Sequence, residues 1–354
     1  MRPRGTRTRE WFGLFVLLLA ASATSTSLQV PVPGRGTSRP NAAPGEPALP
    51  PTLTPVFEFH SSFWMNLHHF LYHQARGLAA SSPTDATGEL HIQPVGAELT
   101  PVEAADWQCA LDYYRAEFAG RDLVFSTDLV RIKNRLAELQ NARDLQQSGL
   151  RPELVAVLER AAAVYRRHWW PAHDLQNRLW VAEAAALVER FGPPLAEKLA
   201  AVYQTPWPAG RIWVDVTLYA GRTGAYTSLD PLHVTLASAE PRNQGLAALE
   251  VLFHEASHAL ADRVRETIEQ RFRARGSPIR RDLWHAILFY TTGEMVRRTL
   301  HEAGEQAYLP YAFRYGLYVR GWEQYLRLIE QYWKPYLDGR ADFERALTRL
   351  VNAF

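Results

Sequence analysis

Residues 251–260 carry three ionisable side chains within an otherwise apolar run that contains no Pro and no Gly. These side chains are His254, Glu255 and His258. An apolar run without helix breakers predicts a buried helix, and unpaired ionisable groups are costly to bury. Positions i and i+4 lie on one face of a helix, so His254 and His258 can each direct a ring nitrogen toward one ion. A bound metal ion would reconcile these polar groups with a buried helix.

The third residue of this set indicates what the metal would do. Glu255 follows His254 directly, so its side chain lies about 100° around the helix axis, beside the ion rather than on it. Zinc held by three protein ligands keeps a fourth position for water, and it lowers the pKa of that water to about 7. Glu255 could then accept the proton. The residues therefore predict one catalytic Zn²⁺, with His254 and His258 as ligands and Glu255 as general base.

The spacing His-Glu-x-x-His resembles the active-site helix of the zincin metallopeptidases, and the resemblance rests mainly on residues 251–260. Metzincins extend the motif to HExxHxxGxxH. Here the Gly position is Ala261 and the last His position is Val264, which excludes that branch. The resemblance therefore implies the gluzincin, or thermolysin-like, branch, in which a Glu on a following helix is the third ligand. It also implies that the substrate is a peptide or protein.

Two residues of a helix expected over 280–301 are candidates for the third ligand. Glu294 follows His258 by 36 residues (294 − 258) and lies in an uncharged stretch from 286 to 296. An unpaired carboxylate would be costly there, and Glu294 fits the gluzincin pattern, so it is the preferred ligand. His285 is the alternative, and a residue elsewhere is a third. Nine residues on one helix correspond to about 900° of rotation, so His285 and Glu294 point in nearly opposite directions.

Tyrosines that follow the motif are candidates for a role near the site. Related enzymes often use a Tyr or His donor to stabilise an oxyanion, and Tyr290 and Tyr311 could supply one. However, Tyr311, Tyr315 and Tyr318 recur with the spacing of a packed helix face, so packing is the default interpretation. The sequence does not choose among these tyrosines.

Two further segments contain possible site residues. Tyr226, within 224–227, is a candidate for lining the cleft, because zincins place the edge strand of a small sheet there; an ordinary hairpin loop is the alternative. His69 and His73 also have the i, i+4 spacing of metal ligands. No acidic neighbour completes a catalytic set, so hydrogen-bonded core histidines are the favoured interpretation.

The pattern along the chain predicts a mainly α protein of the α+β class. Short β-branched runs at 211–219 and 232–237 indicate a small antiparallel sheet directly before the HExxH helix. No clear boundary divides residues 56–354, which we interpret as one catalytic domain with an N-terminal helical part (56–205) and a second part (206–354). Helices are expected near 60–79, 100–118, 126–140, 152–169, 173–191, 194–204, 243–272, 280–301, 310–334 and 340–353.

The N-terminal residues predict export. Four arginines precede an apolar run from 11 to 21, and Ala21-Ser22-Ala23 fits a cleavage site, so residues 1–23 are interpreted as a signal peptide. The apolar run is too short for a membrane span, and the mature chain should not insert stably in a membrane. Residues 24–55 are rich in Pro and predict a linker. The expected location is periplasmic or extracellular.

Composition narrows the function further. A formal charge of +2 gives no electrostatic case for a nucleic-acid partner. Cys109 is the only cysteine, so no intramolecular disulfide can form, and the oligomeric state stays open. The sequence therefore predicts an exported zinc hydrolase, specifically a metallopeptidase. The alternative is a non-catalytic binding or scaffold protein of the envelope with a structural or vestigial metal site, and a structural zinc would have no need of Glu255.

Overall fold

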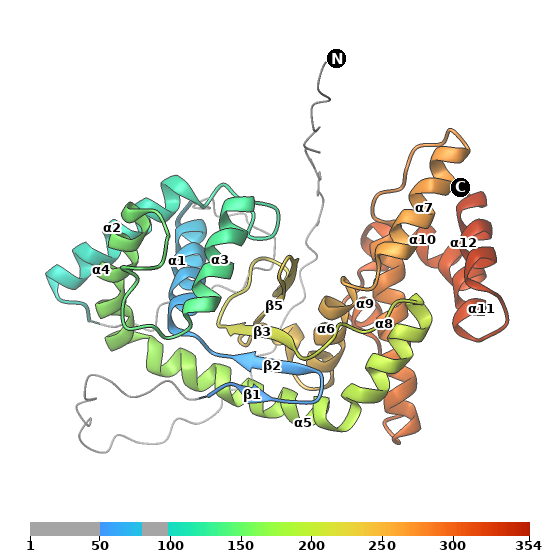
Figure 1. Ribbon diagram of the computed structural model, residues 1–354, viewed down its shortest axis with the longest axis horizontal. Helices are drawn as coiled ribbons and strands as arrows, with labels where there is room; N and C mark the ends of the chain where they lie inside the picture. The colour runs from blue at the N-terminus through green and yellow to red at the C-terminus, as the bar shows by residue number, and fades with distance from the viewer. Residues whose placement is uncertain (1–49, 80–97) are drawn as a thin grey trace, which may run out of the picture.

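The computed structural model describes residues 50–79 and 98–354 (Figure 1). The expected signal peptide and residues 24–49 of the expected linker lie outside the described residues. Helices make up most of the described chain, and five strands form a single sheet, which confirms the prediction of a mainly α protein with a small β component. Within the described ranges, no helix has both the length and the hydropathy that crossing a membrane requires.

The sheet lies between two groups of helices and differs from the predicted antiparallel arrangement. Its strand order is β1-β2-β3-β5-β4, with β2 and β5 parallel to β3, and with β1 and β4 antiparallel to their neighbours. The sheet is therefore mixed. The strands are β1 (Thr52–Leu53), β2 (Phe57–His60), β3 (Ile212–Thr217), β4 (Ala225–Leu229) and β5 (Leu232–Ala237).

The first two strands are the part of the sheet that the sequence did not predict. β1 falls inside the expected linker, and β2 has only four residues directly before a helix. Because β2 and β3 are parallel, a long crossover must join them, and its described residues form five helices. Because β3, the strand that pairs with β2, is so distant along the chain, the four residues of β2 contain no local pattern that predicts a strand.

Four helices after β2 pack into one hydrophobic core on the left of Figure 1. Thr100 caps the second of them, and its side chain and that of Glu103 form the reciprocal bonds of a capping box, as their spacing indicates. These helices are α1 (Phe63–Ala79), α2 (Pro101–Glu117), α3 (Thr127–Leu139) and α4 (Pro152–His168).

Helix α5 (Trp170–Tyr203) runs along the bottom of Figure 1 and links the two groups of helices. The sequence predicted two helices separated at Pro193 and Pro194, but the structure continues one helix through both prolines. Phe191 and Leu195, on either side, are buried in the same core. Tertiary packing thus overrides the helix-breaking tendency of proline at this point.

The C-terminal half forms a second core, which it shares with the sheet and α5. The helix predicted over 243–272 is two helices that separate just after the HExxH motif, and the helix predicted over 310–334 is a series of short segments. The helices are α6 (Leu246–Ser257), α7 (Asp262–Ala274), α8 (Leu283–Glu302), α9 (Tyr311–Arg314), α10 (Glu323–Leu328), α11 (Lys334–Leu337) and α12 (Phe343–Asn352), with π-helical turns at Tyr318–Trp322 and Ile329–Trp333.

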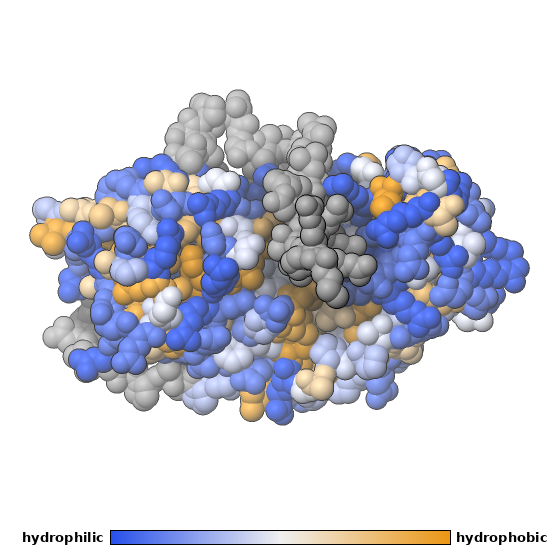
Figure 2. Space-filling model, turned by 45° about the horizontal axis from the view of Figure 1, so that its top comes forward, coloured by the Kyte–Doolittle hydropathy of each residue, from blue (hydrophilic) through white to orange (hydrophobic). Residues whose placement is uncertain are grey.

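The two faces of the sheet contact different partners. Alternate residues of a strand point to opposite faces. Val214 and Leu236 face the core that contains α5 and α6, whereas the neighbouring positions face α1 and α3. Figure 2 shows hydrophobic side chains in the lower middle of the molecule and over the group of helices at the left, among hydrophilic residues. The apolar face of the sheet therefore supports α6, which carries the HExxH motif.

Candidate metal centre

Three histidines meet where α6 ends and α8 begins. His258 directly follows the last residue of α6, one turn after His254, and His285 lies in the first turn of α8. Each of the three offers a ring nitrogen, and these nitrogens all lie within 4.8 Å of one another. The Nε2 atoms of His254 and His285 are 3.3 Å apart. Tetrahedral zinc with Zn–N bonds of about 2.0–2.1 Å separates two ligand nitrogens by about 3.3–3.4 Å, so the spacing of His254 and His285 matches that of two ligands of one zinc ion.

The electrostatics of the cluster suit a cation. Burial lowers the pKa of His254 well below its ordinary value, and the neighbouring imidazoles lower it further. Burial also lowers the pKa of His258 to about 4 and that of His285 to about 3. All three rings are therefore neutral at pH 7, which is the form that coordinates a metal.

Aromatic rings surround the three histidines and fix their orientation. Phe289 stacks on His254 with ring centroids 3.8 Å apart and an interplanar angle of 27°. Trp284 packs edge-on against His258 at 5.6 Å. Metal-binding histidines usually donate their second nitrogen to an outer-shell acceptor. In the described part of the chain, however, Nδ1 of His254 is buried without a hydrogen-bond partner, so packing by Phe289 takes over this orienting role.

Glu255 lies beside the histidines and is held by the sheet. The hydroxyl of Thr227 on β4 lies 2.7 Å from Oε2 of Glu255 and 2.9 Å from its main-chain oxygen. Nε2 of His258 lies 3.9 Å from the same Oε2. Burial raises the pKa of Glu255 to about 7, and the hydrogen bond from Thr227 acts in the opposite direction. The structure thus brings together His254, Glu255 and His258 as the motif indicates, with His285 as the third histidine.

Glu294, the preferred third ligand, lies elsewhere and requires a correction. Its carboxylate accepts two hydrogen bonds of 2.8 Å from Arg297 and one of 2.7 Å from Arg298. Burial alone would raise the pKa of Glu294, but these hydrogen bonds outweigh burial and leave that pKa below its ordinary value. The arginines at i+3 and i+4 thus provide the partner that the uncharged stretch before them did not suggest. Glu294 is not part of the group of three histidines that could hold a metal ion.

Tyr226 also lies away from the histidines. It is on the face of the sheet opposite Thr227, and its hydroxyl lies 2.9 Å from Nε2 of His69. Nδ1 of His69 lies 2.9 Å from the carbonyl oxygen of Met65. His69 is therefore a hydrogen-bonded core histidine, as the sequence favoured. The predicted segment 224–227 does reach the site, but through Thr227 rather than Tyr226.

The two tyrosines proposed as oxyanion donors pack behind the site. Tyr290 is buried against Phe313 on a different side of α8 from His285. Tyr311 is separated from His254 by the ring of Phe289, on which it stacks at 6.3 Å. Neither hydroxyl is placed beside the three histidines, so no tyrosine donor is assigned to the site.

Glu250 is a buried carboxylate that the sequence analysis did not identify. It lies one turn before His254, and its Oε2 accepts hydrogen bonds from the Tyr308 hydroxyl at 2.6 Å and the Tyr311 backbone N–H at 2.9 Å. Burial raises its pKa to about 7, whereas these hydrogen bonds lower it. Within the described ranges, neither Glu250 nor Glu255 forms an ion pair with Lys or Arg. In the sequence, Glu250 could have been identified from its i, i+4 spacing to His254, which places the two residues on one face of the helix.

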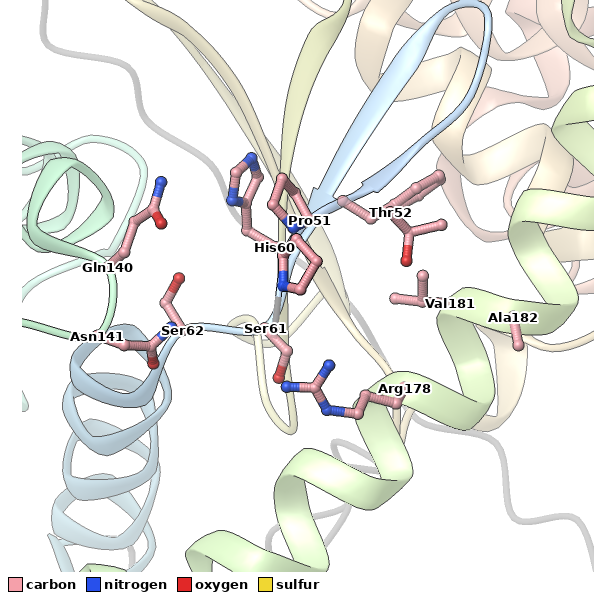
Figure 3. Close-up of a pocket in the computed structure, with 12 residues that line it drawn as sticks. Pro51, Thr52, His60, Ser61, Ser62, Gln140, Asn141, Arg178, Val181 and Ala182 are labelled. Carbon is pink, nitrogen blue, oxygen red and sulfur yellow. The ribbon is translucent and has the colours of Figure 1, made fainter. Parts of the chain in front are cut away.

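A cavity of about 240 Å³ lies at another place, between the end of β2, the residues after α3, and α5 (Figure 3). Its lining includes His60, Ser61, Asn141 and Arg178, and none of the three clustered histidines. Arg178 donates a hydrogen bond to Asp174, so the one cation in this lining is already paired. The cavity is therefore not the place where the metal ligands converge.

Comparison with known proteins leaves the site to be interpreted from its own geometry. No protein-family model matches the chain, and no curated protein or solved structure shows significant similarity to it.

Proposed function

We propose that this protein is a zinc-dependent hydrolase that cleaves peptide bonds, in which His254, His258 and His285 hold the metal and Glu255 is the general base. The observation that supports this most strongly is the convergence of three neutral imidazoles within 4.8 Å of one another, with a buried carboxylate next to them. The proposal keeps the zinc, the two HExxH ligands and the base that the sequence predicted. It replaces Glu294 by His285.

The donor set favours a catalytic over a structural metal. Structural zinc sites are closed by four protein ligands, whereas catalytic sites use three and leave one position open. The group in the described residues contains three. Zinc bound in such a site lowers the pKa of water and polarises a carbonyl. Glu255 would accept the proton from water and pass it to the leaving amine.

Strand β4 supports a peptide as the substrate. It is the last strand of the sheet, and Ala237 donates a hydrogen bond to the carbonyl oxygen of Gly224. Hydrogen-bonded and non-hydrogen-bonded pairs alternate along an antiparallel ladder, so Ala225, Thr227 and Leu229 direct their backbone groups away from β5. An extended peptide can add to such an edge. Its backbone would then lie beside the strand that holds Glu255.

The test compares metal content and hydrolysis in the same preparations. The wild-type chain should hold close to one equivalent of zinc and cleave members of a broad peptide library, and His254→Ala should lose both. Glu255→Gln should keep zinc but lose activity by about 10²- to 10⁴-fold, because it lacks the base. Glu266→Gln, an exposed change on α7, is the matched control and should behave as wild type.

Three outcomes would count against the proposal. A chain that binds no zinc after resupply would exclude the metal centre. Equal cleavage by the wild type and Glu255→Gln would exclude the assigned base. Zinc binding without cleavage by any form would favour the non-catalytic binding or scaffold protein. Export is part of the proposal, and sequencing of the mature N-terminus should find cleavage close to residue 24.

A further inference from the structure

We infer that Thr227 is a positioning residue that couples the edge strand β4 to the orientation of Glu255. This inference rests on the proposed function, since it assigns a role in the same reaction. Thr227 is the point at which the strand that would receive a peptide touches the base. Its side chain contacts Glu255, and its backbone groups point away from β5, toward the edge of β4 on which no strand of residues 50–79 and 98–354 pairs.

The Thr227 hydroxyl has one hydrogen and two acceptors within reach. The carboxylate oxygen is nearer, at 2.7 Å against 2.9 Å for the main-chain oxygen of Glu255, and it is the stronger acceptor when Glu255 is ionised, as a general base must be. The other polar neighbour of Oε2 is Nε2 of His258, which is 3.9 Å away and too far for a hydrogen bond. Thr227 is therefore the side chain that holds the carboxylate in its present orientation.

The distance between β4 and α6 is set by a rigid junction. Asn243, just before α6, donates hydrogen bonds to the carbonyl oxygens of Gly224 at 2.8 Å and Ala237 at 3.2 Å. Gly224 has a φ of +77°, and a Cβ atom there would lie 2.6 Å from Cγ of Glu240. Only glycine fits this position without a shift of the backbone. The strand is thus fixed to the start of the helix that carries Glu255.

This arrangement separates two properties that a substitution at Thr227 can test. Peptide affinity would depend on the backbone of β4, which valine retains, whereas the orientation of Glu255 depends on the hydroxyl, which valine lacks. Thr227→Val should lower kcat by about 10- to 100-fold, in keeping with loss of a hydrogen bond to a charged group, and leave KM within about twofold. Thr227→Ser should restore most of kcat.

The experiment measures kcat, KM and zinc content for these variants, with a double-mutant cycle against Glu255→Gln. If Thr227 acts through Glu255, adding Thr227→Val to Glu255→Gln should lower the residual rate by less than about twofold, whereas independent effects would multiply. Zinc content should stay unchanged throughout, and the affinity of Glu255→Gln for an intact peptide should not change when Thr227→Val is added. Thr235→Val removes a fully buried strand hydroxyl on the opposite face and should leave kcat unchanged.

The results distinguish this inference from the function on which it rests. If the wild type cleaves and Thr227→Val cleaves with the same kcat, the inference is wrong and the hydrolase proposal stands. The same conclusion follows if Thr227→Ser is as impaired as the valine variant, or if the effects multiply in the cycle. Should Thr227→Val not fold, Thr227→Ala provides the hydroxyl-free variant. A wild type that cleaves nothing would overturn both.

Discussion

The two sides of the central sheet both carry buried ionisable groups, but in the described residues only one side places a buried lysine near a buried carboxylate. On the face toward α3, the Lys133 ammonium lies 2.7 Å from the Ser228 hydroxyl, and Asp215 accepts a hydrogen bond of 2.8 Å from the Trp213 indole. Burial lowers the pKa of Lys133 to about 8 and raises that of Asp215 to about 6, and in each case the charge of the other residue opposes this effect. This face holds charges of both signs.

The face toward α6 and α8 contains no such balance. There His254 and the carboxylates of Glu250 and Glu255 are buried, His258 and His285 are partly buried, and neither carboxylate is ion-paired to Lys or Arg in the described residues. Buried polar groups are costly unless they are paired. A divalent cation would supply the missing positive charge on this face, whereas the other face needs none. The comparison therefore favours a structural role for Lys133 and Asp215 and supports the metal-binding role that we propose for the histidines.

Lys133→Met gives the largest expected change in stability and tests the structural half of this comparison. It removes the ammonium that donates to the Ser228 hydroxyl and whose charge opposes the effect of burial on Asp215, and loss of a hydrogen bond that involves a charged group typically costs about 1.5–3 kcal/mol of the free energy of unfolding. Chemical denaturation measures this loss. Lys198→Met, which removes a partly exposed lysine paired with Glu302, should cost less than about 1 kcal/mol. Folded Lys133→Met should bind zinc as wild type does; a selective loss of zinc would contradict the comparison.

The second prediction concerns the two candidate ligands on α8. His285→Ala should weaken zinc binding by more than the roughly 100-fold that loss of an outer-shell partner can cost, because it removes a ligand. Glu294→Ala should change zinc affinity by less than about threefold, since its carboxylate is bound by Arg297 and Arg298. Competition with a chromophoric chelator measures both affinities. The reverse order would restore Glu294 as the ligand.

These two residues show where prediction of the site from sequence stops. His254, Glu255 and His258 could be predicted because helix geometry alone places residues one and four positions apart. The choice between His285 and Glu294 depends on how α8 is rotated about its axis relative to α6, which is a property of tertiary packing. The pair of arginines after Glu294 was the local signal that favoured an ion pair.

The sheet shows the same limit. The runs that become β3 and β5 could be recognised from their β-branched residues, but β2 is too short to be recognised without its distant partner. Tyr226 and Thr227 differ by one position along β4, and because side chains alternate, that single step decides which one faces Glu255. The sequence located this segment, but only the fold shows which face each residue occupies.

The Glu250→Gln substitution tests whether the side of the sheet toward α6 and α8 holds a carboxylate that has no ion-pair partner. The pKa of Glu250 rises from 4.5 to about 7 on folding, so the folded state keeps a proton that the unfolded state releases, and stability is lost as pH rises through this range. Glutamine does not titrate. The free energy of unfolding of the variant minus that of the wild type should therefore increase by about 3 kcal/mol from pH 4 to pH 8. Denaturation at several pH values measures this difference, and a constant difference would indicate that a cation balances the charge of Glu250.

The Phe289→Leu substitution should have a smaller effect on zinc affinity than His285→Ala, and it tests whether ring packing orients His254. Leucine keeps most of the volume but cannot stack on the imidazole, whose Nδ1 is buried without a hydrogen-bond partner in the described residues. Zinc affinity should fall by about 10-fold, as for loss of an outer-shell partner, while a near volume-conserving change should cost less than about 1.5 kcal/mol of stability.

Phe253→Leu is the matched control for this last prediction. Phe253 precedes His254 on α6 and is fully buried, but its ring packs against Phe57 and Trp207, away from the three histidines. This control should lower stability by a similar or larger amount and leave the zinc affinity of the folded protein unchanged. Chelator competition and denaturation on the same samples separate the two effects. If both variants lowered zinc affinity in proportion to their loss of stability, general packing rather than the stacked ring would hold His254 in place.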